Sequence, residues 1–243
     1  MPEAVSLSVV VPVKDEAGNV VPLAREIAAA LKAEKNYEII FVDDGSTDAT
    51  AAELVAMKPS LPLRVLAHAR NLGQSRALRT GIRAARSELI VTLDGDGQND
   101  PADIPKLLDL FRAEAANPAF AMVAGERAKR QDTWKKRLAS RLANKLRRSL
   151  LNDSANDTGC GLKVFRREAF LALPYFDHMH RYLITLMQRE GYAIRFVRVG
   201  HRPRGTGKSK YGVIDRALVG VRDLLGVMWL KRRFRGPAET KEL

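Results

Sequence analysis

The sequence is poor in cysteine and in aromatic residues, and it lacks a long apolar run. Cys160 is the single cysteine, so an intramolecular disulfide is excluded, and we interpret it as a small buried packing residue. Aromatic residues make up 6% of the chain and no RNA- or DNA-binding signature is present, so we expect no nucleic-acid partner. The longest stretch without a charged residue, Ala115–Gly125, has 11 residues, whereas a membrane-spanning helix needs about 20. No membrane-spanning helix is therefore predicted.

Acidic residues are in deficit, with 28 Asp and Glu against 41 Lys and Arg, a formal net charge of +13. Ten basic residues fall between Arg127 and Arg148, where Asp132 is the one acid. Apolar residues recur there at every fourth position, at Trp134, Leu138, Leu142, Leu146 and Leu150. The pattern predicts an amphipathic helix lying on anionic lipid; a core-facing stripe with a solvated basic face is the alternative.

The C-terminal stretch Val213–Arg235 repeats this mixture of apolar and basic residues and predicts a second amphipathic helix at a membrane surface. The tail, residues 236–243, is expected to be disordered. The start of the sequence shows no signal peptide, and the lone cysteine favours a reducing compartment. We therefore expect a cytoplasmic protein, peripheral on the cytoplasmic face of a membrane, with an integral membrane protein as a further candidate partner.

Short apolar runs alternate with segments of helical spacing along the first half of the chain. The predicted strands are Leu7–Val13, Tyr37–Val42, Leu63–Ala67 and Glu88–Leu93. The predicted helices are Val20–Lys35, Asp48–Met57, Gly73–Arg86 and Pro101–Ala115. This alternation is typical of an α/β fold with a mostly parallel sheet and helices on both faces. Without repeats or linkers, we expect a single domain over residues 1–235.

The segment Asp94–Pro101 carries the strongest indication of chemistry. Asp94 and Asp96 follow a predicted strand, and the alternation of side chains along an extended chain lets both carboxylates point the same way. Two hard oxygen ligands, completed by substrate phosphates, suit Mg2+ or Mn2+. A tight Asp-Gly turn that closes a hairpin is the alternative interpretation.

Polar clusters follow all four predicted strands, at Pro12–Glu16, Asp43–Asp48, Ala69–Arg76 and Asp94–Asp100. Ligands of doubly wound sheets bind beyond the carboxyl ends of the strands, so these clusters are expected to converge on one rim. The carboxylates of Asp43–Asp48 suit the N–H groups of a base or the hydroxyls of a ribose, although helix capping explains Asp48 better. Arg70 and Arg76 flank a helix start that favours an anion such as a diphosphate; a solvated helix face is the alternative for Arg76.

Several motifs together resemble the donor-binding half of family-two glycosyltransferases, and more narrowly the polyprenol-phosphate enzymes of the dolichol-phosphate mannose synthase type. The motifs are Val10–Glu16, Val42–Asp48, Asn71–Gly73, Asp94–Pro101 with Gln98, His180–Tyr182 and His201–Gly212. The resemblance covers roughly residues 6 to 215. It implies a Rossmann-like glycosyltransferase A-type domain, with a donor half over residues 1–125 and an acceptor and membrane half over 126–235.

The resemblance also implies roles for individual residues. Those expected to bind the nucleotide-sugar are Pro12, Val13, Glu16, Asp44, Asn71 and Gly73. Those expected to gather round Mg2+ or Mn2+ are Asp94, Asp96 and Gln98. A loop with Arg204, Ser209 and Lys210 is expected to close over the diphosphate and the acceptor phosphate. Arg127 stands where relatives contact phosphate, and Asp157 near the sugar or acceptor, whereas Lys14 departs from the tyrosine of many relatives.

The implied reaction is metal-dependent, inverting transfer of a sugar from a UDP- or GDP-linked donor to a polyprenyl phosphate. A phosphate monoester is already anionic near neutral pH, its second pKa being about 6, so it can attack without a general base. The acceptor phosphate still has to be positioned by cations. The candidates are Arg127, Arg181, Arg202, Arg204, Lys208 and Lys210.

Rival functions are disfavoured by missing motifs. A sugar nucleotidyltransferase would have a glycine-rich loop with Arg after the first strand, and a processive synthase would have Gln-x-x-Arg-Trp; neither is present. The nearest alternative is a family-two transferase that uses another lipid or a saccharide hydroxyl as acceptor.

Overall fold

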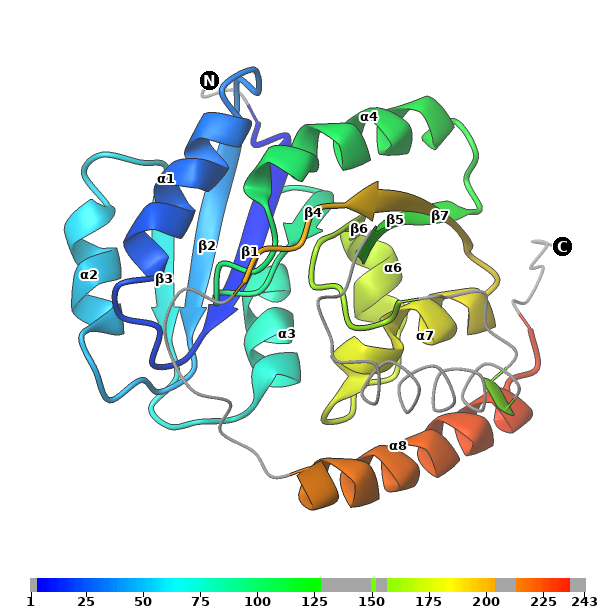
Figure 1. Cartoon of the computed structure of the whole chain (residues 1–243). Coiled ribbons are helices and arrows are strands. Elements are labelled where there is room, and N and C mark those ends of the chain that lie inside the picture. Colours follow the sequence, from blue (N-terminus) through cyan, green and yellow to red (C-terminus); the bar gives the residue numbers. More distant parts are fainter. Residues whose placement is uncertain (1–3, 128–149, 152–156, 204–212, 237–243) are drawn as a thin grey trace, which may run out of the picture.

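The structure is a computed structural model that describes residues 4–127, 150–151, 157–203 and 213–236, with the backbone alone over 213–219 (Figure 1). The described strands form one seven-stranded sheet in the order β3-β2-β1-β4-β6-β5-β7. They are β1 (Leu7–Val13), β2 (Tyr37–Asp43), β3 (Leu63–Ala67), β4 (Leu89–Thr92), β5 (Phe120–Arg127), β6 (Lys163–Arg166) and β7 (Ala193–Val199). Only β6, among these, is antiparallel to its neighbours, β4 and β5. The predicted α/β class with a mostly parallel sheet is confirmed.

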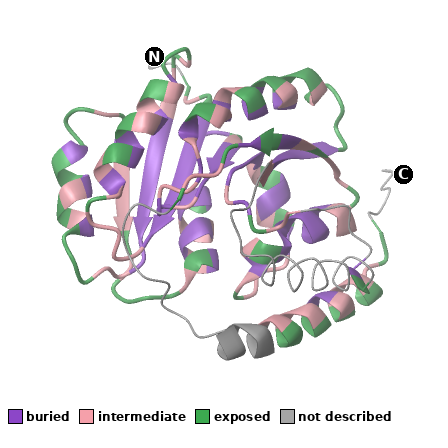
Figure 2. Cartoon of the chain, in the orientation of Figure 1, coloured by how far each residue is buried: buried purple, intermediate pink, exposed green. Residues whose placement is uncertain are grey.

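Helices cover both faces of the sheet. On one face lie α1 (Val20–Ala30), α2 (Thr50–Met57) and α4 (Ile104–Glu114). On the other lie α3 (Gln74–Ala84), α6 (Arg167–Ala172), α7 (Leu183–Arg189) and part of α8 (Val213–Arg233). Side chains alternate along β1, so Val9 and Val11 join the first core and Val10 the second. Figure 2 shows the resulting buried strands between helices that are exposed on their outer sides.

The observed boundaries differ from the predicted ones at helix ends. β1 and β3 have the predicted bounds, whereas α1 ends at Ala30, well before Lys35. The helix predicted from Pro101 is split into a 3-10 turn, η1 (Pro101–Asp103), followed by α4. Asp100 accepts a hydrogen bond from the Ala102 N–H (3.0 Å), which caps this turn.

The strand directions place several loops at one rim of the sheet. Because β1, β2, β3 and β4 are mutually parallel, the residues that follow them leave the sheet at the same edge. β6 is antiparallel to both β4 and β5, so β5 runs in the same direction as β4. β7 is parallel to β5 and therefore shares this direction. The convergence of polar loops on one rim is therefore confirmed.

The C-terminal helix is confirmed as α8, close to its predicted bounds. The segment predicted to form the other basic helix, from Trp134, lies outside the described residues, apart from Leu150 at its end. The predicted disordered tail also lies outside them.

Candidate active site

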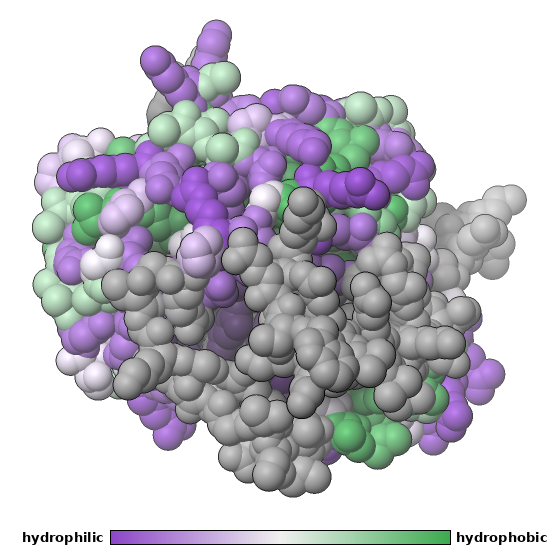
Figure 3. All heavy atoms as spheres, viewed as in Figure 1, coloured by the Kyte–Doolittle hydropathy of each residue, from purple (hydrophilic) through white to green (hydrophobic). Residues whose placement is uncertain are grey.

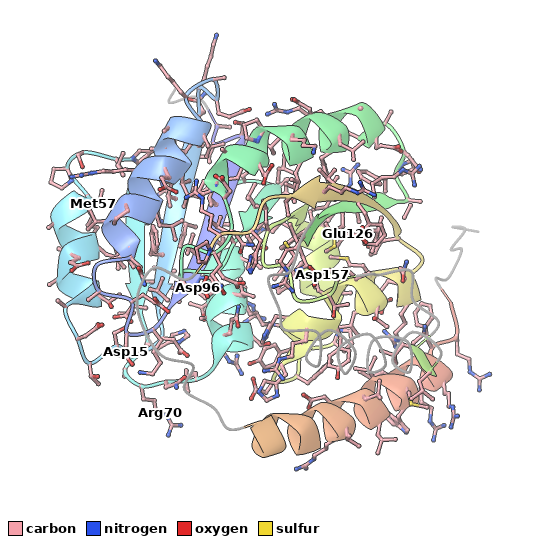
Figure 4. The ribbon with its side chains drawn as sticks, in the orientation of Figure 1. Asp15, Met57, Arg70, Asp96, Glu126 and Asp157 are labelled. Atoms are coloured by element: carbon pink, nitrogen blue, oxygen red, sulfur yellow. The ribbon has the colours of Figure 1, made fainter. Side chains whose placement is uncertain are left out.

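The paired carboxylates lie at the rim directly after β4. Asp94 Oδ1 accepts a hydrogen bond from Gln74 Nε2 (2.8 Å), and Asp96 Oδ1 accepts one from the Gln98 N–H (3.1 Å). Asp96 is near the centre of the molecule, with Asp157 on the side of β5 (Figure 4). The hairpin interpretation is wrong, because the chain continues from this turn into η1 and α4 rather than into an antiparallel strand.

The Asp94 carboxylate is confined against the backbone of a neighbouring segment. A Cβ atom added to Gly161 would stand 2.5 Å from the Asp94 carboxylate, so glycine at this position makes the space that the carboxylate fills. Burial raises the pKa of Asp94, and the negative charge of Asp96 raises it further. A confined, electrostatically strained pair of carboxylates fits a divalent cation.

Two protein carboxylates do not complete a coordination shell. In the part of the chain that the structure describes, no group of three or more His, Cys, Asp or Glu side chains is arranged to hold a metal ion. Mg2+ is often held by one or two carboxylates together with substrate phosphates, so this donor set suits it. The remaining ligands would come from Gln98, as predicted, and from the phosphates.

His201 begins the motif His201–Gly212, in which the sequence indicated no separate role for this histidine, and it lies beside the loop that follows Asp96. It pairs with Asn99 in an isolated antiparallel bridge, while the Arg202 N–H donates to the Gln98 carbonyl (2.9 Å). His201 Nδ1 is buried and has no hydrogen-bond partner among the described residues. Burial lowers the pKa of His201, so its ring is neutral at pH 7. A buried, unpaired imidazole nitrogen next to this loop suits a ligand rather than packing alone.

Arg127 and Asp157 are brought to the same rim, where they bind each other. Arg127 Nε lies 2.6 Å from Asp157 Oδ2, and Nη2 lies 2.7 Å from Oδ1. Burial by itself would raise the pKa of Asp157, but its hydrogen bonds from Arg127 outweigh burial and hold the pKa below its usual range. A phosphate contact by Arg127 stays a prediction, and the observed role of the pair is to hold this part of the rim together.

Three of the residues predicted to bind the nucleotide, Pro12, Val13 and Glu16, lie at the end of β1 and in the loop that follows it. Pro12 and Val13 are buried, and the Val13 side chain and the Pro12 carbonyl oxygen pack against Gly95 in the loop that carries Asp94 and Asp96. Glu16 is half-buried and accepts a hydrogen bond from Asn19 Nδ2 (2.7 Å).

The loop after β1 is tied to the loop after β2. The Glu16 N–H donates to Thr50 Oγ1 (2.8 Å), and Lys14 Nζ donates to the Gly45 carbonyl (2.9 Å). Asp48 accepts a hydrogen bond from the Thr50 N–H (3.0 Å), the first amide of α2, and it does so from the position before the N-cap residue, Ala49. These bonds fix one side of the rim before any ligand binds.

Asp44 and the turn that contains Asn71 and Gly73 form one hydrogen-bonded unit. The Asp44 carboxylate accepts from the N–H groups of Leu72 (2.9 Å) and Gly73 (2.8 Å). Asn71 Oδ1 also accepts from the Gly73 N–H (3.0 Å). The structure therefore joins three of the predicted donor-binding residues.

Several predicted cations have other partners in the described structure. Arg76 stacks over the Tyr175 ring, with its guanidinium carbon 4.2 Å from the ring centroid. Arg202 donates to Glu26 (2.6 Å) and to Asp100 (2.7 Å), so it anchors the end of the segment Asp94–Asp100 to α1. The predicted loop residues Arg204, Ser209 and Lys210 lie outside the described residues.

Lys163 is a buried cation that sequence reasoning missed. It begins β6, is buried, and donates a hydrogen bond to the Cys160 carbonyl. Burial lowers the pKa of Lys163, whereas the charges of nearby acidic groups, Asp94 among them, oppose this effect. No local signal marks this lysine, because its importance comes from strand pairing with β4.

The sequence is similar to those of known glycosyltransferases. The profile of Glycosyl transferase family 2 matches residues 8–173. The dodecaprenyl-phosphate galacturonate synthase of Rhizobium johnstonii is 36% identical over 236 residues, which are 95% of this chain and 68% of the relative. The undecaprenyl-phosphate 4-deoxy-4-formamido-L-arabinose transferase of Edwardsiella ictaluri is 35% identical over 211 residues, 86% of this chain and 63% of the relative. The chain thus spans about two thirds of the length of these relatives.

Solved structures share the fold at low sequence identity. Glucosyl-3-phosphoglycerate synthase from Mycobacterium tuberculosis, in complex with Mn2+, UDP-glucose and glycerol 3-phosphate, superimposes with a TM-score of 0.67 at 19% identity. The match covers 96% of this chain and 82% of that one. Its likeness establishes the architecture of the sheet and its helices.

Proposed function

The chain belongs to glycosyl transferase family 2, and we propose that it is an inverting transferase that moves a sugar from a UDP- or GDP-linked donor to a polyprenyl phosphate. The observation that carries this proposal is the confined pair Asp94 and Asp96 at the rim. A divalent cation, Mg2+ or Mn2+, held there with Gln98 would act as a Lewis acid toward the charge that develops on the departing nucleoside diphosphate. The Mn2+ and UDP-glucose complex of the mycobacterial structure supports this choice of metal and donor.

The nucleoside is assigned to the part of the rim that follows β2. A carboxylate offers about four lone pairs, and the described residues direct three hydrogen bonds to Asp44. The remaining acceptor position suits a base N–H, which uracil and guanine both offer. The donor choice of UDP or GDP is consistent with this arrangement.

The acceptor is assigned from the relatives and from the chemistry of phosphate. The two relatives named above are a dodecaprenyl-phosphate and an undecaprenyl-phosphate enzyme. An anionic phosphate oxygen attacks without a general base, so the protein has to position it rather than deprotonate it. We assign this positioning to Arg204, Ser209 and Lys210, with Arg127 and Asp157 shaping the adjacent rim.

The membrane surface is assigned to α8. Among its side chains, Val221, Leu225 and Trp229 recur every fourth residue and are 57%, 60% and 59% exposed, whereas Val227 on the opposite side is fully buried. Figure 3 shows hydrophobic side chains gathered on the surface over this helix. A basic cluster, Lys231–Arg233, ends it. An exposed apolar stripe beside cations suits an anionic lipid surface, which we place at the cytoplasmic face, alone or with an integral membrane partner.

Within the described residues, no helix combines the length and apolar character that crossing a membrane requires.

The test is to incubate the protein with Mg2+ or Mn2+, a short-chain polyprenyl phosphate and a panel of nucleotide-sugars, and to follow mass in the lipid phase. A glycosyl phospholipid that forms with the wild type and not with Asp96→Asn supports the proposal. Transfer to diacylglycerol or to a saccharide in parallel reactions, with none to the polyprenyl phosphate, would replace it with the alternative acceptor class.

A further inference from the structure

Asp44 is held by a histidine that no motif singled out. His68 follows β3, and its Nδ1 lies 2.7 Å from Asp44 Oδ1. Its other ring nitrogen, Nε2, lies 2.9 Å from Thr80 Oγ1 on α3. The His68 N–H also donates to the Asp43 carbonyl (2.8 Å), which fixes the backbone of the histidine. The imidazole is therefore held on both sides and bridges β2 to α3.

The proton positions follow from the partners. An ionised carboxylate can only accept, so His68 Nδ1 carries a proton that it donates to Asp44. In the neutral ring Nε2 is then an acceptor, and it accepts a hydrogen bond from the Thr80 hydroxyl. Asp44 is 4% exposed, so this bond forms away from water and is strengthened by the charge of the carboxylate.

The same carboxylate controls the turn Arg70–Gly73 through the two N–H groups already described. The turn lies directly on the end of β2, because a Cβ added to Gly45 would stand 2.6 Å from the Arg70 carbonyl carbon. Gly45 and Gly73 have positive φ angles of 71° and 89°, which glycine adopts without strain. The position of the turn therefore depends on close backbone packing and on the orientation of Asp44.

The turn continues into the metal end of the site. Gly73 precedes the first residue of α3, Gln74, whose side chain donates to Asp94 (2.8 Å). One connected path thus runs from His68 through Asp44 and the turn to the metal carboxylate. A shift of Asp44 would therefore be transmitted through the turn to the hydrogen bond between Gln74 and Asp94.

We infer that His68 is a positioning residue of the donor site, which holds Asp44 and, through it, the turn Arg70–Gly73 in the donor-binding arrangement. The inference rests on the proposed function for the nature of the ligand. A histidine that served stability alone would change the melting temperature and leave donor affinity as it is.

The experiment compares His68→Ala with His68→Asn, whose side-chain amide can still donate to Asp44. Arg64→Gln is the matched control: Arg64 lies on β3, the strand that precedes His68, and donates to the buried Glu38 (2.6 Å), away from the rim. Calorimetry with UDP and with GDP in the presence of Mg2+ should show Kd raised about tenfold in His68→Ala, because part of the binding free energy would be used to return Asp44 and the turn to the donor-binding arrangement. His68→Asn should recover most of the affinity, and Arg64→Gln should bind normally despite a lower melting temperature. In turnover assays the alanine variant should raise the donor KM and leave kcat within about threefold of wild type.

A second readout needs no ligand. Hydrogen exchange of the Leu72 and Gly73 amides, followed by NMR, should accelerate in His68→Ala, return toward wild type in His68→Asn and stay unchanged in Arg64→Gln. Unchanged exchange and affinity in His68→Ala, or equal losses in Arg64→Gln, would overturn the inference. If the wild type binds neither nucleotide, the proposed donor fails, and the exchange rates still decide whether His68 positions the turn.

Discussion

Arg127 at the end of β5 and Asp157 form a bidentate ion pair whose members stand on either side of the segment 128–156. Both hydrogen bonds are short, 2.6 and 2.7 Å, and the two side chains are 14% and 13% exposed. Replacing one member of such a buried ion pair is costly, because the charge of the other member stays buried without its counter-ion. The pair therefore ties the end of β5 to the residues that precede β6.

The first prediction concerns this pair. Arg127→Gln should lower the free energy of unfolding by about 3 kcal/mol, since it leaves Asp157 ionised and unpaired. The double variant Arg127→Gln with Asp157→Asn should recover part of that loss. Urea unfolding of the single and double variants gives the coupling energy, and additive losses would show that the pair contributes no mutual stabilisation.

The second prediction separates stability from activity at the metal carboxylates. Because burial and the charge of Asp96 raise the pKa of Asp94, its ionised form is disfavoured in the metal-free fold. Asp94→Asn should raise the melting temperature without metal, and both Asp94→Asn and Asp96→Asn should reduce turnover by orders of magnitude.

Asp48→Asn is the control for that result. Burial would raise the pKa of Asp48, but hydrogen bonds from Thr50 outweigh it and lower the pKa. Its amide variant should therefore lower the melting temperature, because a neutral amide accepts weaker hydrogen bonds from Thr50 than the carboxylate does. The melting temperatures of all three variants are measured by calorimetry with and without Mg2+. A lower melting temperature of Asp94→Asn without metal would contradict the conclusion that the ionised form of Asp94 is disfavoured in the fold.

The third prediction is a pH dependence of stability at His180. Burial lowers its pKa from 6.5 to about 3, and Ser75 Oγ lies 2.8 Å from its Nδ1. Between about pH 3 and pH 6.5 the His180 ring binds a proton in the unfolded chain and not in the folded one. The contribution of His180 to stability is therefore fully present above pH 6.5 and is lost progressively as the pH is lowered. The slope from this residue is at most about 1.4 kcal/mol per pH unit. His180→Asn should flatten the dependence of the melting temperature on pH between 7 and 5; an unchanged slope would assign the acid sensitivity to other groups.

The fourth prediction concerns the exposed stripe of α8. Leu225→Glu and Trp229→Glu should release the protein from vesicles that contain anionic lipid, because they remove apolar contact and add like charge. Val55→Glu, at a 54% exposed position on α2, is the matched control and should leave binding unchanged. Flotation of the three variants decides the matter: equal retention of all of them would remove α8 from the membrane surface.

Local sequence patterns predicted most of the strands and helices of the first half. The alternation of Val and Ile runs with helical segments is a local property, and β1 and β3 were predicted to the residue. The rim followed from the parallel topology, so the loops carrying Asp44, Asn71 and Asp94 could be placed together before their distances were known. The family resemblance, carried by short motifs at fixed spacing, is confirmed by the match over residues 8–173.

By itself, then, the sequence determined the fold class, the family and the convergence of polar loops, because each depends on periodicity or on short contiguous motifs. Tertiary structure decided which charged groups meet. The antiparallel insertion of β6 buries Lys163 near the carboxylate of Asp94, and Arg127 at the end of β5 pairs with Asp157, which lies 30 positions further along the chain. It also decided that His68 reaches Asp44 across 24 positions of the chain. Such contacts depend on strand order and packing between distant segments, to which no local pattern responds.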